Sequence, residues 1–358
     1  MKSKKVLFLL PYPLQTAPSQ RFRIEAYFPL LQQAQINIAT QSFLDETAWT
    51  RLYKKGSFFL KILDVCKGFI KRLWAATFLV HQYDFIVVHR EASPIGPPVF
   101  EWIIAQLWKK KVVFDFDDAI WIPTISDNNR LALSLKCFWK TKWICKWAYK
   151  IAAGNEYLAG YAKQFNSDVI IVPTAVDIVN KYNRLVNQEV SKPAIGWTGS
   201  HSTMKYLDPI IPVIRELEQK KDFDFFVISN KQPEFQLRSL KYIKWTEASE
   251  INDLSKFNIG IMPLEEDRWS EGKCGFKIIQ YLALGIPAVA SPVGVNKRII
   301  KDRLNGFLSK REEEWYNAIS ELLEDVKLRN EMGRIGREKI IKEYSIQANA
   351  DLFLGLFE

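Results

Sequence analysis

Three carboxylates follow a short apolar run in the stretch VVFDFDDAIW, residues 112–121. Carboxylates at this spacing are compatible with several kinds of chemistry. Asp115 and Asp117 could hold a divalent metal ion, or they could form the Asp-x-Asp unit of a phosphatase whose nucleophile ends a hydrophobic strand. Alternatively, Asp117 or Asp118 could cap the turn after a strand, or orient an acceptor hydroxyl. The residues alone leave these alternatives open.

A second polar segment, EEDRWSEGKCGFKIIQYLALGIPAVAS at residues 265–291, joins a charged loop to an amphipathic helix. We expect the helix to begin near Lys273, with Lys273 and Lys277 on one face because they are four residues apart. Cations near a helix N-terminus oppose the helix dipole. A polyanion that docks there therefore explains the two lysines better than a solvated basic face does.

The turn TGSHST, residues 198–203, contains small residues that let a ligand approach the backbone. We expect Ser202 to cap the following helix, whose first amides would favour an anion. The alternative is an ordinary connection between a strand and a helix.

Each polar segment follows an apolar run of strand length, and such runs alternate with helical patterns along the chain. Strands that are apolar throughout indicate parallel sheets covered on both faces. We predict an α/β fold of two tandem Rossmann-like domains, with ligands bound in an interdomain cleft beyond the carboxyl ends of the strands. The predicted domains are 1–177 and 194–336, with a linker at 178–193. A last helix, about 337–358, is expected to pack back on the first domain.

The composition excludes several classes of protein. The 358 residues are 48% hydrophobic, which does not fit a disordered chain. The net charge of +10 points to phosphates, nucleic acid or an anionic membrane surface as partners. The four cysteines form no CxxC pair, so we expect free thiols in a reducing compartment. The three histidines are too scattered for a zinc site. The longest uncharged stretch, 278–296, is interrupted by glycine and proline and does not predict a membrane span.

Two basic segments rich in aromatic residues, 51–80 and 136–150, are predicted to be amphipathic helices. In the second, Trp139, Trp143 and Trp147 recur every four residues among lysines. Such helices suit an anionic membrane interface, so we expect a cytoplasmic protein bound peripherally to the inner face of the cell membrane. The alternative is that the aromatic side chains pack on the sheet. We find no RNA-binding motif that would favour nucleic acid.

The segment GKCGFKIIQYLALGIPAVASPVGVN, residues 272–296, resembles the donor-binding segment of family 4 retaining glycosyltransferases. These enzymes have the GT-B fold of two Rossmann-like domains. VPTAVD at 172–177 and IGWTGS at 195–200 resemble the turn before the family's linker and the first strand of its second domain. The resemblance covers nearly the whole chain. It implies transfer of a sugar from a nucleotide-sugar donor to an acceptor hydroxyl, with retention, no required metal and no tightly bound cofactor.

The resemblance also implies roles for residues of the predicted phosphate site. Lys273 and Lys277 would neutralise the donor diphosphate as its negative charge develops. Gly199 and Ser200 would lie against the same phosphates, with Ser202 at the helix start beside them.

The pair of glutamates that the family has around this helix start is not intact. The second glutamate, which holds the nucleotide ribose, falls on Gln280, whose amide can still bond a hydroxyl. The first falls on Gly272, with Glu271 adjacent. We expect Glu271 or Glu266 to contact the transferred sugar.

The glycine-rich acceptor-side loop of the family is missing after the first strand, where PYPLQTAPSQRFR stands instead. Ser19 could cap a helix there, and Ser19, Arg21 and Arg23 would bind an anionic acceptor. The alternative is exposed charge at a helix start. In this arrangement Asp117 or Asp118 would orient or deprotonate the acceptor hydroxyl.

We therefore predict a glycosyltransferase of envelope or lipid-linked glycan assembly, with a glycan or lipid-linked acceptor. One alternative is a catalytically inactive GT-B partner subunit that binds nucleotide sugar or glycan, which Gln280 and the missing glycine-rich loop motivate. Another is the phosphatase that Asp115 and Asp117 suggest, although we find no later glycine–aspartate motif to complete a magnesium site.

Overall fold

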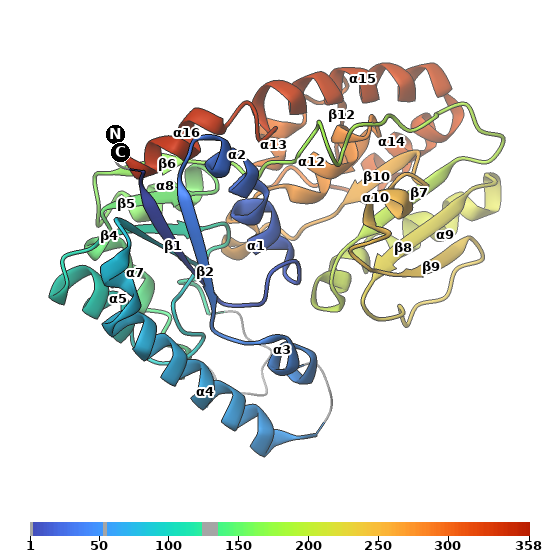
Figure 1. Ribbon diagram of the computed structural model, residues 1–358. Helices are drawn as coiled ribbons and strands as arrows, with labels where there is room; N and C mark the ends of the chain where they lie inside the picture. The colour runs from blue at the N-terminus through green and yellow to red at the C-terminus, as the bar shows by residue number, and fades with distance from the viewer. Residues whose placement is uncertain (1–2, 53–55, 124–134) are drawn as a thin grey trace. The chain divides into compact units, whose positions relative to one another are not determined.

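The computed structural model describes residues 3–52, 56–123 and 135–358. The chain divides into two compact units, an N-terminal unit of Met1–Thr174 with Asn349–Glu358 and a C-terminal unit of Ala175–Ala348. Among the described residues, each unit has one six-stranded parallel sheet flanked by helices (Figure 1). The predicted α/β fold with two Rossmann-like sheets is confirmed.

The sheet of the N-terminal unit has the strand order β2-β1-β3-β4-β5-β6. Its strands are β1 Lys5–Leu10, β2 Asn37–Ser42, β3 Phe85–His89, β4 Lys111–Phe116, β5 Lys150–Ala153 and β6 Val169–Ile171. β3 is buried throughout, and β1 and β4 are buried after their first lysine. Burial on both faces is the reason that these central strands are mostly apolar.

Short helices and one long helix surround this sheet. They are α1 Pro18–Arg23, α2 Phe28–Gln33, α3 Glu46–Leu52, α4 Phe58–Thr77, α5 Val99–Trp102, α7 Lys140–Trp147, α8 Glu156–Ala162 and α16 Ala350–Leu354. Single turns join them at Glu25–Tyr27, Leu79–Gln82, Ile103–Leu107 and Gly355–Phe357. The end of the chain packs on this unit, since the Phe353 ring stacks on Tyr27 at 4.0 Å and Lys150 Nζ donates to the Gly355 carbonyl at 2.7 Å.

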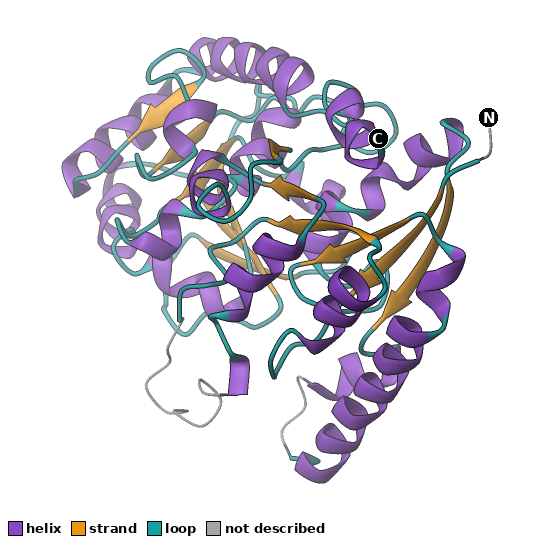
Figure 2. Cartoon of the chain, turned by 90° about the vertical axis from the view of Figure 1, so that its left-hand side faces the viewer, coloured by secondary structure: helices purple, strands orange, loops and turns teal. Residues whose placement is uncertain are grey.

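The long helix α4 is the prominent helix of the N-terminal unit (Figure 2). Its buried Arg72 donates hydrogen bonds to the carbonyls of Leu10, at 2.7 Å, and Gln41, at 3.2 Å, where β1 and β2 end. Arg72 therefore fixes α4 to the carboxyl edge of the sheet. None of the helices in the described part of the chain is long and apolar enough to cross a bilayer. Of the predicted basic segment 51–80, residues 53–55 lie outside the described residues.

The sheet of the C-terminal unit has the order β12-β11-β10-β7-β8-β9. Its strands are β7 Ala194–Thr198, β8 Asp224–Ser229, β9 Leu240–Lys244, β10 Ile259–Met262, β11 Ala288–Ala290 and β12 Gly306–Leu308. Its helices are α9 Ile211–Lys220, α10 Glu250–Leu254, α11 Arg268–Glu271, α12 Phe276–Ala283, α13 Asn296–Ile299, α14 Glu312–Glu324 and α15 Val326–Glu343, with a 3-10 helix at His201–Leu207.

In both sheets the strand order reverses direction at one point. The reversal lies between β1 and β3 in the N-terminal unit and between β7 and β10 in the C-terminal unit. In open parallel sheets this switch point, at the carboxyl ends of the strands, is where ligands bind. The segments after β1, β3, β7 and β10 are therefore the first places to look for a site.

Three local predictions were wrong. Ser19 does not cap α1, because Pro18 takes the first helical position and Ala17 the N-cap. The helix expected from Lys273 begins at Phe276, after Gly275 with φ of +65°, so Lys273 precedes α12 and does not share a helix face with Lys277. Ser202 lies inside the 3-10 helix, and no side chain caps that helix.

Candidate functional site

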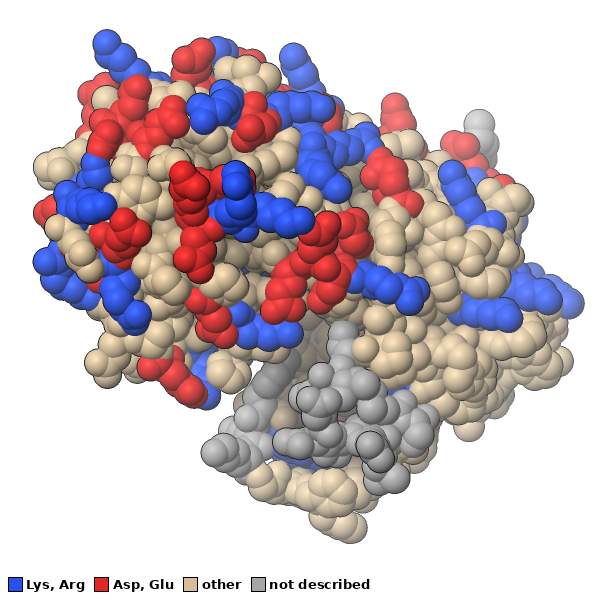
Figure 3. Space-filling model, turned by 180° about the vertical axis from the view of Figure 1, so that it is seen from behind, with Lys and Arg blue, Asp and Glu red and all other residues tan. Residues whose placement is uncertain are grey.

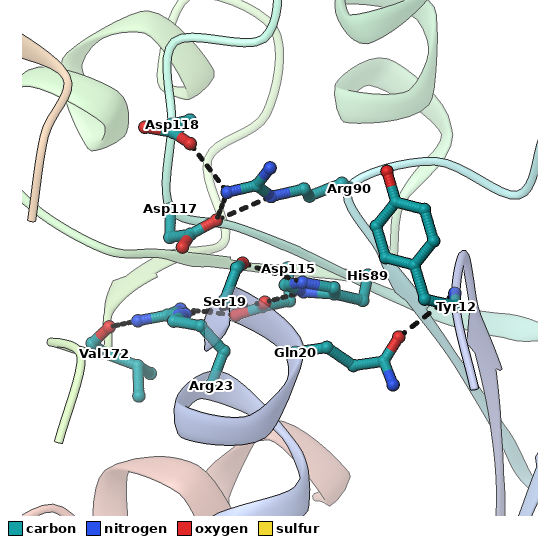
Figure 4. Close-up of polar contacts among 10 residues, drawn as sticks. All are labelled: Tyr12, Ser19, Gln20, Arg23, His89, Arg90, Asp115, Asp117, Asp118 and Val172. Atoms are coloured by element: carbon teal, nitrogen blue, oxygen red, sulfur yellow. Dashed lines mark hydrogen bonds and ion pairs between the residues drawn. The ribbon is translucent and has the colours of Figure 1, made fainter. Parts of the chain in front are cut away.

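In the N-terminal unit, Asp115 is buried near the carboxyl end of β4 (Figure 4). One of its oxygens accepts a hydrogen bond from Arg23 of α1, and the other lies 2.7 Å from Nδ1 of His89 at the end of β3. Arg23 also donates to the Val172 carbonyl after β6. Since a buried carboxylate needs such partners, Asp115 holds α1, β3 and β6 together and is closed to solvent.

A row of hydrogen bonds leads from Asp115 towards the surface. His89 is buried, and its Nε2 lies 3.0 Å from Oγ of the partly exposed Ser19 (Figure 4). Ser19 is also a hydrogen-bond partner that lowers the pKa of Asp117. Because a hydroxyl both donates and accepts, Ser19 can connect the buried His89 to the carboxylate of Asp117.

Asp117 and Asp118 are held by Arg90, the residue after β3. Arg90 Nε donates to Asp117 Oδ1 at 2.8 Å and Nη2 donates to Asp118 Oδ2 at 2.6 Å (Figure 4). Arg90 has a left-handed φ of +61°, which is uncommon outside glycine. We call this arrangement the Arg90 clamp. It leaves the three side chains partly exposed, with one net negative charge.

The clamp sets the ionisation of its own groups. Burial tends to raise the pKa of Asp117, but the positive charge of Arg90, with more distant cations, outweighs it and leaves that pKa well below its usual range. Burial tends to lower the pKa of Arg90, and the two aspartates outweigh it. Asp117 is therefore an ionised hydrogen-bond acceptor and a weak base at neutral pH. Within the described ranges, no group of three or more His, Cys, Asp or Glu side chains is arranged to hold a metal ion.

The structure separates the predicted acceptor residues into two environments. Ser19 is partly exposed beside the clamp, whereas Arg21 and Arg23 on the same helix are buried. Arg23 faces Asp115, so it supports the cluster from inside. Sequence reasoning missed His89, which ends β3, and Arg90, which follows it. It also missed Tyr12 after β1, whose amide donates to Gln20 Oε1 at 3.3 Å. The signal that could have found them is their position at strand ends beside the switch point.

In the C-terminal unit, Trp197 at the end of β7 brings two predicted segments together. Lys277 of α12 has its Nζ 5.7 Å from the centroid of the Trp197 ring. A Cβ on Gly199 would lie 2.6 Å from the same ring, so only glycine allows this turn to pack there. Tyr281 fixes the arrangement, because its hydroxyl accepts from Thr198 N at 3.2 Å. The turn after β7 and the start of α12 therefore meet on one indole.

Hydroxyl groups gather on the exposed side of that turn. Ser200 Oγ lies 2.9 Å from Ser202 Oγ and 3.4 Å from Thr203 Oγ1. His201 N donates to Asn230 Oδ1 at 2.8 Å, which fixes the start of the 3-10 helix. The cluster offers several donors where the first amides of a helix are also found, an arrangement that suits an anion.

The other predicted donor residues lie in the loop around α11 and in α12. Lys273 places its Nζ 4.8 Å from the centroid of Trp269. Glu271 is the last residue of α11, and its backbone lies against Gly294, whose Cβ would approach the Glu271 carbonyl at 2.8 Å. The exposed Glu266 pairs with Lys310 at 2.5 Å.

Gln280 was expected to bond a hydroxyl of the nucleotide ribose, but its side chain is not exposed. It is buried on α12, and its Nε2 donates to the hydroxyl of Tyr182 at 2.7 Å. The amide therefore ties α12 to the segment that precedes β7. The glutamine replaces a charged side chain at a position where burial would penalise the charge.

Residues 192–325 match the model of a family described as glycosyl transferases group 1. No curated protein matches the chain.

The fold is similar to several solved structures. Sucrose-phosphate synthase (tll1590) from Thermosynechococcus elongatus gives a TM-score of 0.70 at 12% identity, covering 99% of this chain and 98% of that one. Anabaena Alr3699/HepE in complex with UDP and glucose gives 0.68 at 14% identity, covering 98% of both chains. The lipopolysaccharide outer core galactosyltransferase WaaB gives 0.61 at 12% identity, also covering 98% of both. The C-terminal unit therefore carries the match to the glycosyl transferases group 1 family, and the two Rossmann-like units together have the GT-B fold of these solved structures.

Proposed function

We propose that this enzyme transfers a sugar from a nucleotide-sugar donor to an acceptor hydroxyl, with retention of configuration and without a required metal. The observation that carries the donor assignment is the meeting of Gly199 and Lys277 on Trp197. Three features at this strand end suit a diphosphate. They are a turn with space only for glycine, a cluster of hydroxyl groups and a lysine. HepE, which shares the fold, was solved with UDP-glucose, so UDP-glucose is the first donor to test.

The lysines and the turn after β7 have different roles in binding the nucleotide diphosphate. Lys273 and Lys277 neutralise the diphosphate as it leaves the sugar. Gly199, Ser200 and Ser202 approach the same phosphates with amides and hydroxyls. Negative charge that develops in the transition state is stabilised most by donors already in place.

The remaining donor residues act at the two ends of the nucleotide sugar. Glu266 or Glu271 contacts the transferred sugar, and Gln280 contributes on the ribose side. In this proposal the buried amide of Gln280 acts by holding Tyr182 and the start of the β7 segment.

On the acceptor side, we assign Asp117, Asp118 and Ser19 to the acceptor hydroxyl. A carboxylate with a lowered pKa accepts a hydrogen bond well and takes a proton poorly. Asp117 therefore orients the hydroxyl, Asp118 is the alternative proton acceptor, and Ser19 completes the set. Arg21 and Arg23 contribute from within the fold, by positioning α1 and Asp115.

The acceptor in this proposal belongs to an envelope or lipid-linked glycan at the inner face of the cell membrane. The exposed side of α4 supports membrane contact. It carries a stripe of apolar side chains, namely Phe59, Leu63, Ile70, Leu73 and Trp74. Lysines 61, 67 and 71 on the same helix suit anionic lipid. WaaB, which shares the fold, is a lipopolysaccharide outer core galactosyltransferase.

A screen of nucleotide sugars by thermal shift, followed by calorimetry and a hydrolysis assay, tests the function. We expect one nucleotide sugar to raise the melting temperature and to be hydrolysed slowly without acceptor. Tight binding with neither hydrolysis nor transfer would instead support the alternative of an inactive partner subunit. Magnesium-dependent phosphate release from simple esters, with no nucleotide-sugar binding, would overturn the proposal.

A further inference from the structure

An apolar groove of about 280 Å³ lies on the surface of the N-terminal unit. It is lined by Pro97, Pro98, Val99, Trp102, Trp139, Trp143 and Trp147. No polar or charged side chain is among the lining residues, and four are tryptophans. We call this feature the tryptophan groove.

The groove exists because α7 buries a different face in the core. Ile144 and Cys145 of α7 are fully buried, whereas Trp139 and Trp143 remain 53% and 36% exposed. The tryptophans follow one another at four-residue spacing, so they share one side of the helix. Trp102, the last residue of α5, also lines the groove. An aromatic surface of this kind in water indicates a binding site.

Positive charge stands at the edge of the groove. Lys142 and Lys146 are exposed and place their Nζ atoms 5.8 Å and 5.3 Å from the centroid of the Trp143 ring. Figure 3 shows Lys and Arg side chains among Asp and Glu side chains over one face of the molecule. Lysine is depleted from the cores of protein–protein interfaces, whereas tryptophan with lysine is typical of contact with anionic amphiphiles.

The groove is tied to the loop that carries the Arg90 clamp. Lys140 at the start of α7 pairs with Glu91 at 2.7 Å and donates to the Ser93 carbonyl at 2.8 Å. Arg90 and Pro97 are 97 − 90 = 7 residues apart, so they are separated by at most about 25 Å. The groove and the Arg90 clamp are therefore built on the same loop after β3.

We propose that the tryptophan groove holds the hydrocarbon chain of a lipid phosphate that carries the acceptor, with Lys142 and Lys146 beside its phosphate. The inference rests on the proposed function and names its acceptor class. The groove volume of about 280 Å³ is just below the roughly 300–1,000 Å³ of pockets that enclose a whole small molecule. It therefore suits one segment of a hydrocarbon chain.

Calorimetry of the full-length protein with farnesyl phosphate tests the inference without membranes. We expect Trp139→Ala with Trp143→Ala to weaken binding at least tenfold, and Leu304→Ala to leave it unchanged. Leu304 is the control because it is 52% exposed, close to the 53% of Trp139, but lies in the C-terminal unit. Lys142→Gln with Lys146→Gln should weaken farnesyl phosphate about tenfold and leave farnesol unchanged. Inorganic phosphate alone should not bind at the groove.

Several outcomes would overturn the inference. One is equal affinity of the double tryptophan variant and the wild type for farnesyl phosphate. Another is binding of phosphatidylglycerol vesicles at the groove in place of farnesyl phosphate. A third is a dimer, detected by sedimentation, that the double tryptophan variant abolishes. The proposed function is measured separately, by nucleotide-sugar hydrolysis. If hydrolysis persists in the double tryptophan variant, while transfer falls to a glycan on a long-chain lipid phosphate but not to the same glycan on a short-chain one, both proposals are supported. If hydrolysis is absent in wild type, the proposed function fails.

Discussion

Arg90 Nε donates a 2.8 Å hydrogen bond to Asp117 Oδ1, joining residues 27 positions apart at the ends of two neighbouring strands. This contact turns an acidic pair that resembled a metal site into a carboxylate already paired with a cation. An ionised carboxylate accepts hydrogen bonds from hydroxyl donors. The contact also makes the ionisation of Asp117 depend on Arg90.

Replacement of Arg90 by glutamine should raise the pKa of Asp117, because burial then acts without the main opposing charge. The folded-state pKa of Asp117 is lowered, so its ionised form stabilises the fold above the unfolded pKa of about 3.9, and this contribution is lost as pH falls through the folded value. R90Q should therefore move the acid limb of the pH–rate profile of transfer to higher pH. It should also cost about 1–3 kcal/mol of folding free energy.

Kinetic measurements of transfer by two single variants test the roles of Asp117 and Asp118. Asp117→Asn should keep the acceptor-side geometry and lower kcat/KM for transfer about tenfold or more, because a neutral amide orients a hydroxyl less strongly. Asp118→Asn should spare donor binding and slow transfer. If both variants turn over at the wild-type rate, the two aspartates only shape the loop after β4.

Lys277→Met should lower kcat for transfer about 100-fold, because a preorganised cation at developing negative charge is worth roughly this factor. The methionine keeps an apolar stem against Trp197, so the fold should be unaffected. Lys273→Ala should act in the same direction. The control is Lys220→Met, an exposed lysine on α9 that pairs with Glu216. A normal rate in both Lys273 and Lys277 variants would contradict the diphosphate role.

Gly199→Ala should raise the KM for the donor and destabilise the C-terminal unit. The new Cβ would lie 2.6 Å from Trp197 and 2.8 Å from Thr203 Oγ1, and such overpacking costs about 1–3 kcal/mol. The matched control is Gly160→Ala in α8, where no atom lies within 4 Å of the new Cβ. The control should leave KM unchanged and not lower the melting temperature. Equal KM values for the two variants would remove the turn from the donor site.

Ile70→Glu should reduce binding to anionic vesicles, because Ile70 is 71% exposed in the middle of the α4 stripe. Loss of one buried isoleucine costs about 1.5–3 kcal/mol of apolar transfer energy, which corresponds to at least a tenfold weaker partition. Leu304→Glu is the control, since Leu304 is 52% exposed in the C-terminal unit. Cosedimentation at two salt concentrations measures both variants. Identical partition of wild type and I70E would exclude α4 as a membrane contact.

The central strands of both sheets could be predicted from the sequence, because residues such as those of β3 and β4 are buried on both faces and are therefore apolar. β2, β9 and β12 were missed. β2 and β9 are half-exposed edge strands whose residues show no apolar run, and β12 has only three residues. A run of apolar residues in the sequence indicates a buried strand, and a strand exposed at the sheet edge has no such run.

The acidic cluster shows why the site was harder to predict than the fold. The sequence identified the strand end that carries Asp115, Asp117 and Asp118. The partners that decide their roles come from elsewhere, since Arg23 is 92 residues from Asp115 and Ser19 is 70 residues from His89. Contacts between distant residues depend on how the strands are ordered in the sheet, and a single sequence does not contain that order.

The tie between the tryptophan groove and the loop of Arg90 has a kinetic consequence. A chain-like molecule held by one end is confined to a small volume, and the second contact then becomes intramolecular. Short tethers give effective concentrations in the millimolar range. A glycan whose lipid occupies the groove would meet the Arg90 clamp at that concentration even when the lipid itself is scarce, so the rate of transfer would follow groove occupancy.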